Sequence, residues 1–273
     1  MAEGHLIHRW AALETAGLVG RPVRASSPQG SFAAGAAELD GRVLLRVEAH
    51  GKHLFHGFEG DRVLHVHFGL AGTLARVVSG APPRQQCRLR LAGATESFDL
   101  YAPRTCALID PAELAARRAA LGPDPLRGDA DPERVWRGLR ERSESIGAAL
   151  LDQSLVAGVG NVLRAEVLHA LGIHPATPAR SLDRPTFEAL WALLAVTMRE
   201  ARDLGRIVTR VPPGETAAVV PEAQARWIYK QARCRRCGDA VETSRIGGRT
   251  AYACATCQPA SGLGPGRLRA RSA

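Results

Sequence analysis

The stretch IGAALLDQSLVAGVGNVLRAEVLHALGIHP, residues 146–175, carries the clearest local structure signals in this chain of 273 residues. Its apolar residues recur at helical spacing on both sides of a short segment that contains Gly158 and Gly160. Asn161 stands where a second helix would be capped, and Gly172 follows the apolar stripe of that helix. The stretch therefore predicts two helices that meet at a sharp angle through a tight, glycine-dependent turn.

The turn before Asn161 admits two interpretations. A helix N-terminus entered through Gly-Val-Gly-Asn presents backbone N–H groups without bulky side chains, and such a terminus attracts a phosphate. The other interpretation is a helical hairpin in which the glycines only permit close packing. The turn alone favours neither of them.

The overall composition fits a globular protein with one large or two modest domains. The longest apolar run, near residues 190–198, is too short to span a bilayer, and the N-terminus lacks the basic-then-apolar pattern of a signal peptide. We therefore expect a cytoplasmic, monomeric protein with no membrane partner.

Basic charge is concentrated at the C-terminal end. From Arg226 onward ten Arg or Lys residues stand against Asp239 and Glu242, so this segment carries +8 of the formal net charge of +9. A basic module on a nearly neutral body is typical of proteins that bind nucleic acid. A solvated tail would explain the arginines after residue 266, but not those around the cysteines.

The N-terminal half predicts one helix followed by antiparallel strands. Residues 3–16 offer one apolar face at helical spacing, and this pattern stops at Gly17. Short alternating runs separated by Gly or Pro follow, as expected for a sandwich or barrel. We predict strands over residues 42–49, 53–58, 63–68, 73–78, 87–91 and 96–100.

The domain organisation follows from these elements and from the Pro-, Asp- and Gly-rich segment GPDPLRGDADPE at residues 122–133, which resembles a linker. The predicted fold class is α+β with several domains: a helix plus antiparallel β-sandwich, then a helical domain that carries a zinc β-hairpin. The predicted boundaries are 1–120 for the sandwich domain, 121–131 for the linker, 132–225 for the helical domain, 226–258 for the zinc hairpin and 259–273 for a disordered basic tail.

Two CxxC pairs give the strongest general chemical signal. Cys234 and Cys237 are separated by sixteen residues from Cys254 and Cys257. Each pair can place two thiolates on one cation, and the spacer suits a β-hairpin, so we predict one closed, structural Zn²⁺ site. A redox pair is the alternative that two matched CxxC units disfavour. The remaining cysteines, Cys87 and Cys106, are expected to pack as small buried hydrophobes.

Lysine usage singles out one position near the strands. Only Lys52 and Lys230 are lysine among 36 basic residues. Lys52 follows Gly51 at a strand turn, where amine rather than guanidinium chemistry could be required. Its survival by chance is the alternative. Five nearby histidines alternate along the strands without a recurring acidic partner, so we expect strand packing or phosphate contact rather than a metal site there.

Three segments together resemble the Fpg/Nei family of DNA glycosylases. DQSLVAGVGNVLRAEVLHALGIHP (152–175) closely resembles its helix-two-turn-helix motif. GGRTAYAC (247–254) resembles the tip of its zinc finger, and GKHLFHGFEGDRVLHVHFGLAGTL (51–74) resembles its strand-loop-strand region. The resemblance extends over nearly the whole chain, to about Gln258.

Several DNA contacts are implied by this resemblance. Lys52, Asn161 and Arg249 match residues that hold phosphates near the lesion, and the lysine is needed for catalysis in the family. A glycosylase must also fill the gap that a flipped base leaves. Leu70 matches the main wedge residue of the family, and Arg104 matches the arginine of its second loop.

The N-terminus departs from the family pattern. In the family, removal of the initiator Met exposes a proline whose amine attacks the sugar C1′, and the following glutamate assists proton transfer. Here the start is Met1-Ala2-Glu3. A small second residue favours Met removal, and a free α-amine with a pKa of about 7.7–8.0 is partly unprotonated at neutral pH. Ala2 and Glu3 are therefore the expected nucleophile and general acid/base, whereas Leu6 replaces an acid found in many members.

The resemblance implies a base-excision repair glycosylase with AP lyase activity that acts on damaged double-stranded DNA, or on single strands, in the nucleoid. Cys106 stands where Fpg proteins carry an intercalating Phe, which favours Nei-like removal of oxidised pyrimidines. Two alternatives stay open: a catalytically weak or silent protein that binds damaged DNA, and a glycosylase with no lyase step.

Overall fold

The computed structural model describes residues 2–260, so most of the predicted tail 259–273 lies outside the described residues. The chain divides into two compact units, Met1–Leu121 and the part from Gly122 onward. Within the described residues no helix is both long and apolar enough to cross a membrane.

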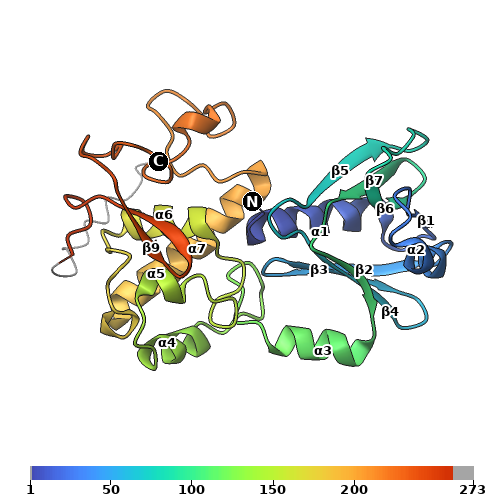
Figure 1. Cartoon of the computed structure of the whole chain (residues 1–273), viewed down its shortest axis with the longest axis horizontal. Coiled ribbons are helices and arrows are strands. Elements are labelled where there is room, and N and C mark those ends of the chain that lie inside the picture. Colours follow the sequence, from blue (N-terminus) through green and yellow to red (C-terminus); the bar gives the residue numbers. More distant parts are fainter. Residues whose placement is uncertain (1, 261–273) are drawn as a thin grey trace. The chain divides into compact units, whose positions relative to one another are not determined.

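The first unit contains two four-stranded antiparallel sheets (Figure 1). One sheet has the order β2-β3-β4-β8 and the other the order β1-β6-β7-β5. The first comprises β2 (Leu44–His50), β3 (His53–Phe58), β4 (Arg62–His67) and β8 (Thr105–Ile109). The second comprises β1 (Arg24–Ser26), β6 (Cys87–Ala92), β7 (Glu96–Tyr101) and β5 (Thr73–Val78).

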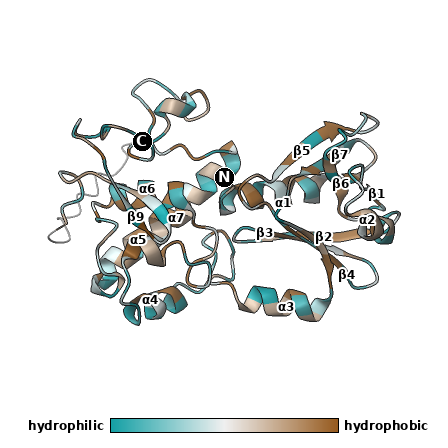
Figure 2. Ribbon diagram, viewed as in Figure 1, coloured by the Kyte–Doolittle hydropathy of each residue, from teal (hydrophilic) through white to brown (hydrophobic). Residues whose placement is uncertain are grey.

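Apolar side chains from both sheets form the core of the first unit. Leu54 and Leu64 of one sheet and Leu89 and Phe98 of the other are at most 2% exposed and belong to one cluster. Figure 2 shows hydrophobic residues along these strands. The facing sides of the two sheets thus form a sandwich core, and β3 and β4 are buried along nearly their whole length because Phe55 and Val63 pack in a second cluster with Leu114 of α3 (Pro111–Ala119).

Three helices complete the first unit: α1 (Gly4–Leu18), α2 (Ala33–Leu39) and α3 (Pro111–Ala119). α1 packs on β2 and β3 and buries Ile7 and Leu18 completely. The buried Glu14 carboxylate of α1 lies 3.1 Å from His56 Nε2 on β3, so the helix is also tied to the sheet by a polar contact. A capping box at Asp110 and Glu113 starts α3.

The second unit is helical and ends in a β-hairpin. Its elements are α4 (Pro132–Arg140), α5 (Ile146–Ala149), α6 (Asn161–Ala170), η1 (Ala179–Ser181), α7 (Arg184–Leu204), η2 (Glu222–Gln224), β9 (Glu242–Ile246) and β10 (Arg249–Ala253). Ile146, Leu163, Leu168 and Met198 are among the buried residues of its core. The predicted α+β architecture with a helical C-terminal domain is confirmed.

Residues 122–125 are buried parts of this second unit. The Gly122 N–H donates to Gln153 O at 2.8 Å, and the Ala157 N–H donates to Pro123 O at 2.9 Å. Asp124 is 1% exposed. The segment that composition marks as a linker is thus packed against the turn between α5 and α6, because its backbone groups pair with that turn.

Candidate nucleic-acid interface and metal centre

The first site is the start of α1. Glu3 is the N-cap residue of this helix and is completely buried, and its side chain makes no hydrogen bond that caps the helix. Ala2 is half-buried against the core of the first unit. A fully buried carboxylate thus follows directly on the residue whose amine is the predicted nucleophile.

Lys52 and Arg104 lie near the end of β4, around His67. Lys52 follows Gly51 in the two-residue turn between β2 and β3, where Gly51 has a φ of +58°. Burial lowers the pKa of His67, and the charges of Arg104 and Lys52 lower it further. The structure therefore brings two predicted DNA-binding cations together around one neutral imidazole.

Leu70 and Arg104 occupy two adjoining loops. Leu70 is 65% exposed in the loop between β4 and β5, although it is a large hydrophobic residue. A Cβ on Gly69 would lie 2.7 Å from the Cβ of Arg104, so glycine is required for the loops to approach this closely. An exposed leucine beside an arginine can enter the space that a flipped base leaves in DNA.

Cys106 lies on β8 rather than in this pair of loops. It pairs with Val66 of β4 and packs against the core of the first unit, and burial raises its pKa to about 12. Cys87 is fully buried on β6. Both thiols therefore behave as small core side chains.

In the second unit, the start of α6 differs by one residue from the sequence prediction. Gly160 is the N-cap, with an extended backbone, and no side chain caps the helix. Asn161 is the first helical residue, is 8% exposed, and donates from Nδ2 to Thr250 O at 3.0 Å. The predicted cap residue thus joins α6 to the β-hairpin instead of capping its own helix.

Arg164 is a buried residue that sequence reasoning missed. It is 1% exposed, and Nη1 donates to Gly147 O at 3.1 Å and to Ile246 O at 2.9 Å. Nη2 donates to Thr250 O at 2.9 Å and to Asn161 Oδ1. One guanidinium therefore joins α5, α6 and both strands of the hairpin. Its position in the apolar stripe, three residues after Asn161, was the available signal.

Arg249 begins β10 and is exposed. Gly247 and Gly248, with φ values of +61° and +71°, form the two-residue hairpin turn before it. A Cβ on Gly247 would lie 3.2 Å from Ala148 Cα, so the tip packs closely on α5. Because Asn161 holds the carbonyl of Thr250, the structure brings the predicted phosphate ligands Asn161 and Arg249 to one place.

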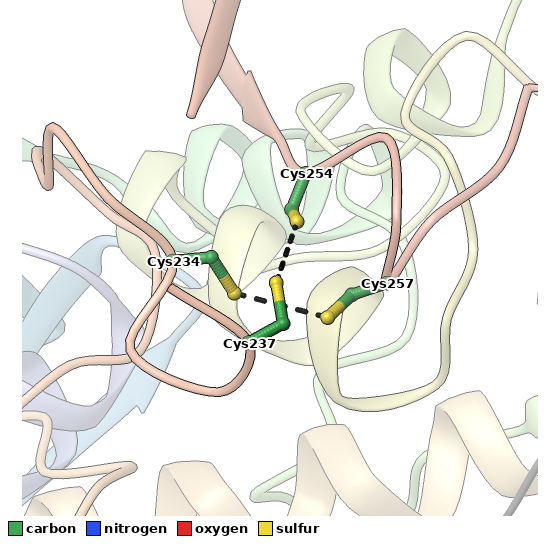
Figure 3. Close-up of side chains that lie close together, drawn as sticks. All are labelled: Cys234, Cys237, Cys254 and Cys257. Atoms are coloured by element: carbon green, nitrogen blue, oxygen red, sulfur yellow. Dashed lines mark hydrogen bonds between the residues drawn. The ribbon is translucent and has the colours of Figure 1, made fainter. Parts of the chain in front are cut away.

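Four cysteines form a candidate metal centre at the base of the hairpin. The sulfur atoms of Cys234, Cys237, Cys254 and Cys257 all lie within 4.8 Å of one another. Figure 3 shows the four side chains pointing toward one another. The cluster can hold one metal ion. Four cysteine ligands would complete its tetrahedral coordination, so no position would stay open for water or substrate.

His169 lies beside this cluster. Its Nε2 is 3.2 Å from Cys234 Sγ, and the residue is completely buried near the end of α6. Burial, together with the charge of Arg236, lowers the pKa of His169 to about 3. A neutral imidazole can donate its N–H to a thiolate ligand, so α6 also contacts the metal centre.

Two family models match the chain, one in each unit. Residues 3–109 match the formamidopyrimidine-DNA glycosylase N-terminal domain, and residues 121–233 match the formamidopyrimidine-DNA glycosylase H2TH domain. The second match contains Asn161 and Arg164, and the first contains Glu3, Lys52, Leu70 and Arg104.

Curated relatives and solved structures agree with these matches. Endonuclease 8 1 of Mycobacterium tuberculosis (strain ATCC 25618 / H37Rv) is 42% identical over 267 residues, which cover 94% of this chain and 100% of the relative. The formamidopyrimidine-DNA glycosylase of Thermomicrobium roseum is 31% identical and covers 79% of this chain and 82% of its own length. Lactococcus lactis Fpg, solved with abasic-site DNA, superposes with a TM-score of 0.77 at 24% identity, covering 94% of this chain and 100% of its own; this likeness concerns the fold alone.

Proposed function

The chain belongs to the formamidopyrimidine-DNA glycosylase and endonuclease 8 family of base-excision repair glycosylases with AP lyase activity, and from this premise we propose that it removes oxidised pyrimidines from duplex DNA through the amine of Ala2. The observation that carries the proposal is the start of α1, where the completely buried carboxylate of Glu3 follows a small residue. Removal of Met1 would leave the nucleophile and the proton carrier adjacent in the chain.

The proposed reaction has two stages. The Ala2 nitrogen forms a bond to the sugar C1′ while the bond from C1′ to the base breaks, and the base leaves with a proton. The sugar ring then opens, its ring oxygen takes up a proton, and the nitrogen and C1′ form an imine. Loss of a proton from C2′ expels the 3′ phosphate, which cuts the strand. Glu3 supplies and accepts these protons.

The remaining predicted residues bind the DNA. Lys52, Asn161 and Arg249 contact phosphates, and Leu70 with Arg104 fills the gap in the stack. One Nδ2 hydrogen of Asn161 already goes to Thr250 O, so a phosphate would receive the other. The proximity of Lys52 and Arg104 to His67, and the exposure of Leu70, support these roles.

Zinc is the metal that best fits the four cysteines. Four thiolates bound tetrahedrally at about 2.3 Å from zinc stand about 3.8 Å from one another. The sulfur atoms of Cys234 and Cys257 are 3.8 Å apart. The metal would stabilise the hairpin, and it would take no part in the chemistry because no ligand position is open.

The lesion class and cellular setting complete the proposal. Cys106 packs into the sandwich core, so this position offers no aromatic side chain to the DNA stack. That arrangement supports oxidised pyrimidines over purines as substrates. We place the protein, as a monomer, in the cytoplasm with the nucleoid DNA.

Borohydride trapping tests the proposal. Protein is mixed with duplexes that carry an abasic site or an oxidised pyrimidine, reduced, digested and sequenced by mass spectrometry. We expect a covalent adduct whose linked peptide begins at Ala2. An adduct on Lys52 would mean that the nucleophile has moved. Tight binding without an adduct would favour a silent damage-binding protein, and base release without an adduct a glycosylase that lacks the lyase step.

A further inference from the structure

Lys230 is an exposed residue that holds a left-handed backbone conformation in the turn formed by residues 228–231. Its φ is +56°, and Asp61 and Ala102 are the other non-glycine residues with positive φ between residues 2 and 260. The turn is closed by the Gln231 N–H, which donates to Ile228 O at 3.0 Å. Lys230 is the third residue of this turn, where glycine or asparagine is favoured because a longer L side chain is strained.

A buried carboxylate fixes this turn. Glu166 on α6 is 1% exposed and accepts three consecutive backbone N–H groups just before the lysine. The distances are 2.8, 3.0 and 2.8 Å, from Trp227, Ile228 and Tyr229. These bonds fix the backbone before Lys230, and the bond from the Gln231 N–H to Ile228 O fixes it after Lys230. The fold therefore imposes the strained conformation.

The side chain of Lys230 lies beside the hairpin that carries Arg249. Its ammonium is 5.8 Å from the ring centroid of Tyr229, and that ring meets Tyr252 of β10 edge-on at 5.2 Å. The lysine is exposed and, within the described part of the chain, forms no ion pair. The contact with the Tyr229 ring does not account for a lysine at this position, because the guanidinium of Arg226 already lies over the same ring at 5.6 Å.

The residue type is the second unusual feature. This chain uses arginine for 34 of its 36 basic residues, and Lys52 and Lys230 are the two exceptions. At Lys230 glycine would remove the strain, so a long cationic side chain at this position indicates a use for its charge.

We propose that Lys230 contacts a DNA phosphate and that its strained backbone aims the ammonium at that phosphate. This inference rests on the proposed function, since it assigns a further DNA ligand to the same protein. A compact, strongly hydrated ammonium on a flexible stem suits a single phosphate oxygen. The contact adds affinity for any sequence and carries no base preference.

Three substitutions in the full-length, zinc-loaded protein test the inference: Lys230→Gly, Lys230→Gln and Lys230→Arg. Affinity for an abasic-site duplex and for an undamaged duplex is measured from 0.05 to 0.5 M salt, together with Tm. Lys230→Gln should weaken both complexes by about eightfold at 0.1 M salt and reduce the slope of log K against log salt by about 0.9. Lys230→Arg keeps the charge and should keep the slope of log K against log salt, but its planar guanidinium should restore the affinity only in part. Lys230→Gly should lose the same affinity while raising Tm by about 2 °C, since it relieves the strain.

Asp61→Gly is the matched control, because Asp61 also has positive φ but lies at the turn between β3 and β4. It should raise Tm without weakening DNA binding. Unchanged affinity and salt slope in Lys230→Gln, with a wild-type protein that binds and cleaves, would overturn the Lys230 contact and leave the proposed function standing. A wild-type protein that binds neither duplex would overturn the proposed function, and with it this contact.

Discussion

The α-amine of Ala2 is primary, whereas the usual N-terminal proline of the family supplies a secondary amine on a rigid ring. Both attack C1′ only when unprotonated. The proline adduct is charged without further help, but the alanine imine must gain a proton before it can act as an electron sink. Base release should therefore run ahead of strand cleavage in this protein, with Glu3 as the proton source.

Replacing Ala2 by proline tests this difference. Ala2→Pro should raise the rate of strand cleavage relative to base release, because its iminium is permanently charged. Both products are measured on one oxidised-pyrimidine duplex, by release of the base and by gel separation of the cut strand. Glu3→Gln serves as the comparison and should slow both stages. A ratio that Ala2→Pro leaves unchanged would argue against Ala2 as the covalent residue.

Leu70 gives a second test at this scale. Leu70→Ala should slow excision of a paired damaged base yet leave binding to an abasic site largely intact, because the wedge acts while the base leaves the stack. Its 65% exposure means that the truncation should change Tm little. Single-turnover excision and abasic-site affinity are measured side by side. Equal losses in the two assays would make Leu70 a plain packing residue.

Single residues differed in how far sequence could place them. Leu70 and Arg249 were assigned correctly to loop and hairpin tip, since both stand next to glycines that a turn requires. Arg164 was missed because an arginine in a helix is normally solvated, and only the tertiary fold brings the carbonyls of Ile246 and Thr250 to it. The local sequence predicts Asn161 as a helix cap because it does not encode the tertiary contact to Thr250 O that this side chain makes.

At the scale of elements, α6 carries buried polar side chains that together reach several other segments of the second unit. Asn161 and Arg164 hold the hairpin tip, Glu166 holds the turn before Lys230, and His169 contacts Cys234. This helix of ten residues thereby contacts the segments that carry Arg249 and Lys230 and one of the four cysteines, Cys234. Its value lies in these polar contacts as much as in its apolar stripe.

Loss of Arg164 should be costly for this reason. Arg164→Leu leaves the buried Gly147 O and Asn161 Oδ1 and the part-buried carbonyls of Ile246 and Thr250 without this donor, so we expect the second unit to lose about 3 kcal/mol of stability. Denaturant unfolding followed by the fluorescence of its tryptophans measures the loss. Arg199→Leu, an exposed arginine of α7, is the control and should stay within about 0.5 kcal/mol of wild type.

The sheet β2-β3-β4-β8 carries a stack of neutral histidines. His53 Nδ1 lies 2.8 Å from His65 Nε2, and the two rings are parallel with centroids 5.1 Å apart. Burial, and then the charge of His67, lowers the pKa of His53 to about 3. Burial, and then the charge of Arg117, lowers the pKa of His65 to about 4. Neither ring is protonated at neutral pH.

These histidines should make the first unit sensitive to acid. The unfolded chain protonates both rings near pH 6.5, whereas the folded sheet does so only near pH 4 and pH 3. The unfolded state thus binds more protons in this window, and stability should fall as the pH drops from about 6.5 toward 4. His65→Phe keeps an aromatic ring beside Phe55. It should reduce the slope of the unfolding free energy against pH by the equivalent of about one proton. The denaturant midpoint of unfolding, measured across this pH range for the wild type and the variant, tests the prediction.

Sequence alternation located most of the strands but not all of them. The predicted strands 53–58 and 73–78 have the bounds found for β3 and β5, because each lies between two glycine turns. The sequence patterns do not predict β1, β8 or α2. β1 has three residues and exists through its pairing with β6, a long-range contact that local pattern does not encode.

At the scale of the whole molecule, the metal centre should stabilise one unit only. Chelation of zinc should unfold the base of the hairpin, residues 233–241 and 253–258, because four unligated thiols cannot hold these loops. The first unit has its own core and should stay folded. Hydrogen exchange with and without chelator, together with metal analysis, measures both effects. Protection lost evenly over the chain, or protein purified without zinc, would contradict this assignment.

The tip of the same hairpin is fastened by Arg164 and Asn161, whose partners are backbone carbonyls rather than cysteines. The hairpin is thus held in two independent ways, by the metal centre at its base and by these hydrogen bonds at its tip. The loss of one would leave the other in place. Substitutions could therefore replace the two cysteine pairs by ordinary packing residues, while the tip stays packed on α5 and Arg249 keeps its position. The proposed zinc site could therefore be lost in evolution without a change of the fold around it.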